Sequence, residues 1–213
     1  MITRLINKIL TITGRKIIQF SPQRSGSTLV FNILRDLFPT RHIDKKHSYN
    51  LDDKNFPTVT TYRHPYDCIG SLILKDQVQP TNEIIEEKIF LFRKDGWNDF
   101  LNQFESKKIL FLRYEDFCND MDFLLNSIEN YFNININQNK RAELKKKYKI
   151  LNVKDSLEKF KSFNEFDEQT HFHGNHISKF LGTPNYYKDL FTPNQLKILD
   201  KYFYNEKKYL NYE

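Results

Sequence analysis

The sequence predicts an α/β fold in which a central parallel β-sheet is flanked by helices. Three short runs of β-branched, aromatic and other apolar residues, at 17–20, 57–62 and 108–114, predict buried strands. Segments with helical spacing lie between these runs, and such alternation is typical of βαβ units and a parallel sheet. Ligands of such sheets bind outside the carboxyl ends of the strands, so we expect the functional site there.

The helices are predicted from the spacing of apolar residues. The first helix opens at Ser27, because Leu29 and Ile33 recur at helical spacing after it. Further helices are predicted at Tyr66–Lys75, 83–104, 119–132, 137–149 and from Thr192, where Pro193 suits the first helical position.

Two stretches of the chain carry no clear helix or strand pattern. Residues 41–55 are polar, and we expect them to connect the first helix to the second strand. Residues 150–190 show little periodicity. Within the predicted helix 83–104, Gly96 is a weak point, because glycine disfavours a helix interior.

The composition is that of a folded protein. A length of 213 residues suits one domain, so we expect residues 1–213 to form a single domain with an N-terminal arm or helix at 1–15. No stretch approaches the ~20 apolar residues of a membrane span, and no integral membrane segment is expected. The two cysteines do not make a disulfide framework, which favours a cytoplasmic location.

Positive charge is concentrated at the start of the chain. The net charge is +6, yet residues 1–50 hold nine Lys/Arg against two Asp/Glu. Because nucleic-acid binding needs basic residues spread along a face, this concentration favours a small polyanionic ligand over nucleic acid. A general solubilising charge is the alternative explanation.

The loop between the first strand and the first helix predicts an anion site. Backbone N–H groups at a helix N-terminus attract anions, and Gly26 lets the backbone approach an oxyanion closely. The side chains of Ser25, Ser27 and Thr28 offer hydroxyl donors, and Arg24 adds a cation. An ordinary Ser-capped helix is the alternative. The loop lacks the Gly-Lys-[Ser/Thr] of a Walker A sequence.

The ends of the other two predicted strands carry matching chemistry. After the second strand, Arg63 and Ser71 can converge as a second anion site, although Arg63 paired with Asp67 is an equally plain interpretation. After the third strand, Tyr114 and Glu115 lie near the same edge, where the tyrosine ring is able to stack on a base or to pack as a half-buried aromatic.

Taken together, these segments resemble the sulfotransferase family that uses 3′-phosphoadenosine 5′-phosphosulfate (PAPS). The sequence SPQRSGSTL, 21–29, is similar to the family's 5′-phosphosulfate loop, and TYRHPYDCIGS, 61–71, matches its 3′-phosphate segment R-x-P-x-D-x-x-x-S. LRYEDF, 112–117, resembles its L-x-Y-E-D strand end, and 176–199 resembles its closing loop and terminal helix. The resemblance covers about residues 16–203 and implies a three-layer P-loop-type fold.

The resemblance also implies a role for each matching residue. Arg24–Thr28 would hold the 5′-phosphosulfate, while Arg63 and Ser71 would hold the 3′-phosphate. Tyr114 would lie near the adenine, and Lys179 would stand in for a basic triplet near the C-terminus. PAPS is then the co-substrate, and no metal is expected.

A general base is implied by the K-x-H pattern between the two phosphate motifs. The pattern makes His47 the candidate base and Lys45 the associated cation, and Arg24 would stabilise charge on the leaving phosphate. A base with a pKa near 7 suits the removal of a proton from an alcohol. The alternatives are a solvated loop histidine at this position and Asp44 or Glu115 as the base.

The expected function is therefore transfer of a sulfuryl group from PAPS to a hydroxyl acceptor, with a carbohydrate as one acceptor class. The alternatives are a P-loop nucleotide kinase-like enzyme and a nucleotide-binding module without catalysis. Neither the acceptor nor the oligomeric state is readable from the residues, and nucleic-acid binding is the least expected function.

Overall fold

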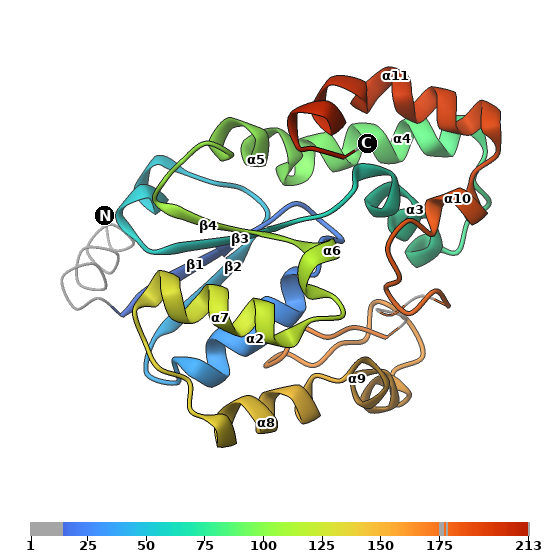
Figure 1. The fold of residues 1–213 in the computed structure, drawn as a ribbon. Coiled ribbons are helices and arrows are strands. Elements are labelled where there is room, and N and C mark those ends of the chain that lie inside the picture. The colour runs from blue at the N-terminus through green and yellow to red at the C-terminus, as the bar shows by residue number, and fades with distance from the viewer. Residues whose placement is uncertain (1–14, 175–176, 178, 213) are drawn as a thin grey trace, which may run out of the picture. The chain divides into compact units, whose positions relative to one another are not determined.

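The computed structural model describes residues 15–174, 177 and 179–212 (Figure 1). The chain divides into two compact units, Met1–Tyr62 with Asp95–Leu144 and Arg63–Lys94 with Lys145–Glu213. The predicted N-terminal arm lies, apart from Arg15, outside the described residues. The assignment of one domain to the whole chain stays a prediction.

The first unit is built on a sheet of four parallel strands in the order β2-β1-β3-β4. The strands are β1 (Lys16–Phe20), β2 (His42–Lys46), β3 (Thr58–Tyr62) and β4 (Ile109–Arg113). Every residue of β1 is buried, as are the first four residues of β3, so the two central strands carry the core of the sheet. The predicted α/β class with a central parallel sheet is confirmed.

Strand β2 was not predicted. Residues 41–55 were expected to be a connection, but His42–Lys46 pairs with β1 along its whole length and η1 (Leu51–Asn55) follows. Only Ile43 of this strand is buried, because β2 lies at the edge of the sheet. An edge strand needs few apolar residues, so the polar sequence of β2 carried no strand pattern that could be recognised.

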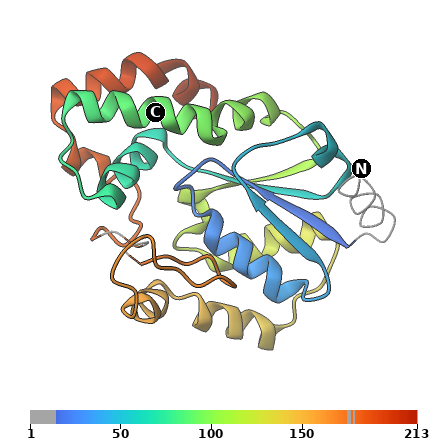
Figure 2. The ribbon, with the colours of Figure 1, turned by 180° about the vertical axis from the view of Figure 1, so that it is seen from behind.

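Helices cover both faces of this sheet (Figures 1 and 2). The helices α2 (Ser27–Leu37) and α7 (Met121–Phe132) lie on one face, and α5 (Asn98–Gln103) lies on the other. Packing explains the placement of α5, since its Phe100 stacks on Tyr62 at 5.3 Å between ring centroids. The short α6 (Tyr114–Phe117) continues directly from β4.

The predicted helix 83–104 is broken, as the position of Gly96 suggested. The structure has α4 (Asn82–Phe92), then η2 (Arg93–Trp97), then α5. Within η2, Asp95 and Gly96 have non-helical backbone angles, and Gly96 adopts φ 105°. Trp97 is fully buried directly after the break, which fixes the kink in the core of the first unit.

The longer regular elements among the described residues of the second unit are helices, and an isolated bridge joins Phe166 to His173. Around α3 (Pro65–Asp76) pack α4, α10 (Tyr187–Leu190) and α11 (Pro193–Tyr209). The helix α11 begins as predicted, with a capping box from Thr192 and a proline at its first position. The helix α9 (Ile150–Leu157) also belongs to this unit and falls in the stretch where little periodicity was found. The helix α8 (Gln138–Lys147) begins in the first unit, which ends at Leu144, and continues into the second.

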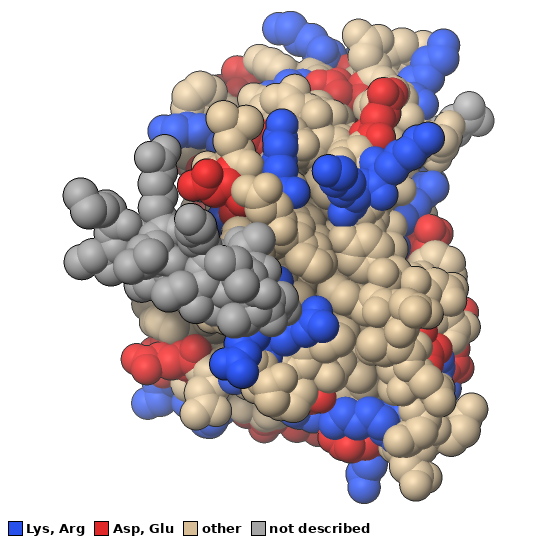
Figure 3. Space-filling model, turned by 90° about the vertical axis from the view of Figure 1, so that its left-hand side faces the viewer, with Lys and Arg blue, Asp and Glu red and all other residues tan. Residues whose placement is uncertain are grey.

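None of the described helices combines the length and apolar character needed to cross a bilayer. Among the described residues drawn in Figure 3, basic and acidic side chains occur on the same face with uncharged surface between them. The net charge of +6 therefore does not describe the distribution of charge on this face, where both signs occur.

Candidate active site

Buried hydroxyl groups form hydrogen bonds that support the anion-binding loop, the segment that follows β1. The Ser25 hydroxyl donates to the carbonyl oxygen of Pro22 at 2.7 Å and lies 2.9 Å from Thr61 Oγ1. Thr61 also donates its backbone N–H to Ser21 Oγ at 2.8 Å. All three hydroxyl side chains are fully buried. The Ser25 side chain therefore shapes the loop from within the protein.

Gly26 is required by both space and backbone conformation. Its φ of 85° is left-handed, and a Cβ there would lie 2.7 Å from Tyr114 Cδ2. The ring of Tyr114, which directly follows β4, thus lies against the loop on the side of Gly26. Arg24 also adopts a left-handed φ of 62°, so two of three consecutive residues turn the loop sharply.

The first turn of α2 presents its N–H groups without a side-chain cap. The N-cap is Gly26, which has no side chain to accept from them, and the first turn contains no acidic residue. The Ser-capped helix considered from the sequence is therefore not what forms. Ser27 and Thr28, the first two residues of α2, are both buried. A helix N-terminus of this kind favours a bound anion.

Lys45 extends from β2 to this helix terminus. Its Nζ donates to Thr28 Oγ1 at 2.7 Å. Burial, followed by the nearby charge of Arg24, lowers the pKa of Lys45 to about 8. Two cations are thus held close together and partly desolvated at one helix N-terminus. An anion bound there relieves their repulsion.

His47 follows β2 and is fixed by a backbone carbonyl. Its Nδ1 lies 2.7 Å from the carbonyl oxygen of Ser21. Because a carbonyl only accepts, Nδ1 carries the proton in the neutral ring, which leaves the lone pair on Nε2. Burial lowers the pKa of His47, as does Lys45, while the Ser21 bond and the charge of Asp95 act in the opposite direction. His47 is therefore neutral at pH 7 and able to accept a proton.

The two alternative bases are engaged with cations. Asp44 pairs with Lys16 at 3.0 Å and with Lys46 at 3.4 Å. Burial alone would raise the pKa of Asp44, but these two lysines bring it below its usual value. Glu115 lies 3.6 Å from Arg113 in a third ion pair. A paired carboxylate is a weaker base than a neutral imidazole.

In the second unit, Arg63 is buried and lies directly before His64, the N-cap of α3. Its Nη2 lies 3.3 Å from Asp67 Oδ2, so the ion pair considered from the sequence does form. The same nitrogen donates to the carbonyl oxygens of Gly182, at 3.3 Å, and Thr183, at 3.0 Å. Ser71, two turns further along α3, is also buried.

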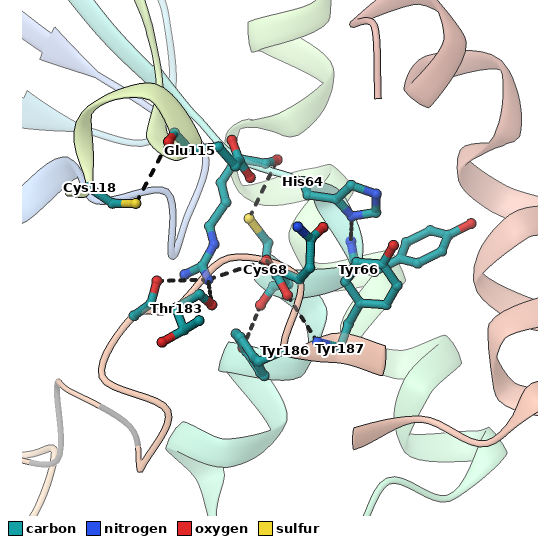
Figure 4. A network of polar contacts seen from close by, with 12 residues as sticks. His64, Tyr66, Cys68, Glu115, Cys118, Thr183, Tyr186 and Tyr187 are labelled. Atoms are coloured by element: carbon teal, nitrogen blue, oxygen red, sulfur yellow. Dashed lines mark hydrogen bonds and ion pairs between the residues drawn. The ribbon is translucent and has the colours of Figure 1, made fainter. Parts of the chain in front are cut away.

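Asp67 joins α3 to residues 185–187, at the start of α10, through hydrogen bonds. Its carboxylate accepts from the backbone N–H of Asn185 at 2.7 Å and of Tyr187 at 3.1 Å, and its carbonyl accepts from the Tyr186 hydroxyl at 2.6 Å (Figure 4). Lys179 is exposed, with its Nζ 5.1 Å from the centroid of the Phe180 ring.

The structure therefore brings together part of the predicted site in each unit. In the first unit it gathers Arg24, Ser25, Gly26, Ser27, Thr28, Lys45, His47 and Tyr114. In the second unit Arg63 lies just before α3, and Ser71 lies within that helix, two turns further along. No group of three or more His, Cys, Asp or Glu residues suited to a metal ion occurs among the described residues.

Sequence reasoning missed the residues that support the loop and His47. Thr61 looks like any β-branched strand residue, and nothing in its neighbourhood marks its contact with Ser25. Gln23 donates to Asp95 at 3.0 Å across 72 positions of the chain. Gly96 was noted only as a weak point in a helix, whereas a Cβ there would lie 2.3 Å from the carbonyl oxygen of His47.

Comparison with known proteins rests on structure alone. No protein-family model matches the chain, and no curated protein matches its sequence significantly. The structure matches mouse sulfotransferase SULT7A1 complexed with 3′-phosphoadenosine 5′-phosphate (PAP), with a TM-score of 0.64, 17% identity, and coverage of 91% of this chain and 85% of that one. This chain has the sulfotransferase fold.

Two further solved structures with this fold are of retinol dehydratase. One, in complex with androsterone and inactive cofactor PAP, gives a TM-score of 0.65 at 13% identity over 92% of this chain and 81% of that one. The other, with retinol and PAP, gives 0.63 at 13% identity over 92% and 82%. The family resemblance found in the sequence motifs is thereby confirmed for the sulfotransferase fold.

Proposed function

We propose that this protein is a PAPS-dependent sulfotransferase that transfers a sulfuryl group to a hydroxyl acceptor. The observation that carries the proposal is the pairing of Arg24 and Lys45 at the uncapped N-terminus of α2. The match to sulfotransferase-fold proteins solved with PAP supports the same ligand class.

The donor chemistry of the loop suits a phosphosulfate. Its groups are the first-turn N–H groups of α2, the Arg24 guanidinium and the Lys45 ammonium, all of which favour an anion. The close approach of Tyr114 to Gly26 places an aromatic ring beside these donors, where an adenine can stack. When bound, PAPS supplies a sulfuryl group joined to a phosphate that is able to leave.

Each catalytic side chain is assigned one role. The Nε2 of His47 takes the proton of the acceptor hydroxyl, since Nδ1 is committed to Ser21. Lys45 and Arg24 stabilise the negative charge that develops on the leaving phosphate oxygen. Thr28 holds the Lys45 ammonium in place through its hydroxyl.

The acceptor is a hydroxylated small molecule. Carbohydrates are one acceptor class expected from the sequence, and the matched retinol dehydratase structures carry androsterone and retinol. Incubating the protein with sulfur-labelled PAPS and a panel of both classes tests the function. We expect labelled product with at least one class. PAP binding without any labelled product would instead favour a module without catalysis.

The pH dependence of kcat/KM for PAPS follows from two pKa values of the free enzyme. His47 accepts a proton only above its pKa, which lies below the usual 6.5, so activity should fall at acidic pH. Lys45 is charged only below its pKa of about 8, so activity should also fall above that pH. In the variant Lys45→Arg the charge persists, and we expect the alkaline fall near pH 8 to disappear. An alkaline fall that stays in place would remove Lys45 from this role.

The 3′-phosphate is assigned to Arg63 and Ser71, and this assignment is tested by comparing PAP with AMP. In Ser71→Ala we expect PAP affinity to fall about tenfold while AMP affinity is unchanged, because one hydrogen bond to a charged group is lost. Arg63→Lys should have the same selective effect. Calorimetry measures both affinities, and a melting curve controls for folding. An unchanged PAP-to-AMP ratio in both variants would contradict the assignment.

A further inference from the structure

The kink between α4 and α5 touches the segment that carries His47. Gly96 lies so close to the carbonyl oxygen of His47 that an added Cβ would be 2.3 Å from it, and 3.5 Å from the Cα of Pro22 in the anion-binding loop. The φ of 105° at Gly96 would also strain the backbone of any other residue. Two positions after His47, the N–H of Tyr49 donates to a carboxylate oxygen of Asp99 at 3.1 Å.

The same kink is bonded to the anion-binding loop. Asp95 Oδ2 accepts from Gln23 Nε2 at 3.0 Å, and Gln23 directly precedes Arg24. One short segment thus contacts both the loop and the His47 segment. Trp97, fully buried beside it, anchors that segment in the core. A rigid element in contact with two functional groups fixes the distance between them.

We propose that Asp95 is a positioning residue for the site. Its hydrogen bond to Gln23 fixes the position of the anion-binding loop relative to His47, whose backbone packs against Gly96. This inference rests on the proposed function. The geometric observations that support it are the Gln23–Asp95 hydrogen bond and the close contact of Gly96 with His47.

Asp95 has an electrostatic role in addition to its geometric one. The charged groups that act on His47 are Lys45, from β2, and Asp95, from η2, and they have opposite signs. Lys45 lowers the pKa of His47, whereas Asp95 raises it. When His47 takes the proton of an acceptor hydroxyl, the imidazolium stands beside the Lys45 ammonium. The Asp95 carboxylate offsets that repulsion.

Three variants separate the two roles. Asp95→Asn keeps an oxygen that accepts from Gln23 but removes the charge, Asp95→Ala removes both, and Gln23→Ala removes the hydrogen bond alone. The control is Asn98→Ala, at an exposed position three residues further on. The readouts are the NMR titration midpoint of His47 and the calorimetric affinity for PAP, with a melting curve for each variant.

We expect the His47 midpoint to fall in both Asp95 variants and to stay in place in Gln23→Ala. We expect PAP affinity to fall about tenfold in Asp95→Ala and Gln23→Ala, but not in Asp95→Asn. An unchanged midpoint in Asp95→Asn, or wild-type PAP affinity in Asp95→Ala, would overturn the proposal. If the wild-type protein binds no PAP, the proposed function fails, while the His47 titration still decides whether Asp95 acts on His47.

Discussion

Replacing Arg24 by Asn should weaken PAP binding by about 10- to 100-fold. Charge-assisted hydrogen bonds contribute roughly 1.5–3 kcal/mol each, and every 1.4 kcal/mol corresponds to about tenfold in affinity. Asparagine is chosen because it tolerates the left-handed φ of 62° at this position, so the loop backbone is retained while the charge is lost. Calorimetry with PAP measures the effect.

The loss should extend to AMP, because the assigned contact is with the 5′ end of the nucleotide. The matched control is Arg41→Ala, which removes a positive charge just before the amino end of β2, away from the carboxyl ends where the loop lies. We expect Arg41→Ala to bind PAP as the wild type does. Equal weakening in both variants would indicate a general effect of net charge, and undiminished binding in Arg24→Asn would remove the loop from its role.

Replacing His47 by Asn should lower kcat by about 10²- to 10⁴-fold, the usual contribution of a general base. The side-chain N–H group of asparagine can take the place of Nδ1 and donate to the Ser21 carbonyl, so the local structure is kept. No group then remains at the position of Nε2 to accept a proton. The measurement is the single-turnover rate with saturating PAPS and an acceptor found in the panel.

PAP affinity is the control for this variant, and we expect it to match the wild type within about twofold, since His47 is assigned no contact in the ground state. A turnover rate close to that of the wild type would exclude His47 as the base. Glu115 would then be the next candidate, because Asp44 lies 3.0 and 3.4 Å from two lysines, whereas the ion pair of Glu115 with Arg113 is longer, at 3.6 Å.

The sequence was sufficient to predict the sheet except for β2, one of its two edge strands. Strands β1, β3 and β4 consist largely of β-branched and apolar residues, a pattern that burial requires. Strand β2 is HIDKK, and its charges are satisfied by ion pairs such as Lys16 with Asp44 and Lys46 with Asp53. No local pattern distinguishes such a strand from a polar connection.

The candidate site was predictable where its residues are consecutive. The segment Arg24–Thr28 predicts an anion-binding loop, because glycine, hydroxyl groups and a cation follow a strand directly. What could not be predicted is how the hydroxyl groups are used. Ser25 was expected to offer its side chain to a ligand, yet that hydroxyl donates to the Pro22 carbonyl inside the protein.

Hydrogen-bond partners that lie far apart along the chain could not be predicted from the sequence. The contact between Gln23 and Asp95 joins positions 72 residues apart, and Asp95 belongs to none of the motifs recognised in the sequence. In the second unit, Asp67 had a predicted partner in Arg63, but its bonds to the backbone of Asn185 and Tyr187 span more than a hundred residues. Such contacts arise from packing of the elements and leave no local signal.

The most direct test of the central claim is an NMR titration that follows the backbone amides of Gly26, Ser27 and Thr28. On addition of PAP in the presence of EDTA, we expect these amides to shift saturably, because the proposed site places the 5′-phosphate at the uncapped N-terminus of α2. ATP with Mg²⁺ should produce smaller shifts at higher concentration. Amides that do not respond to PAP, or that respond only to ATP with Mg²⁺, would contradict the account.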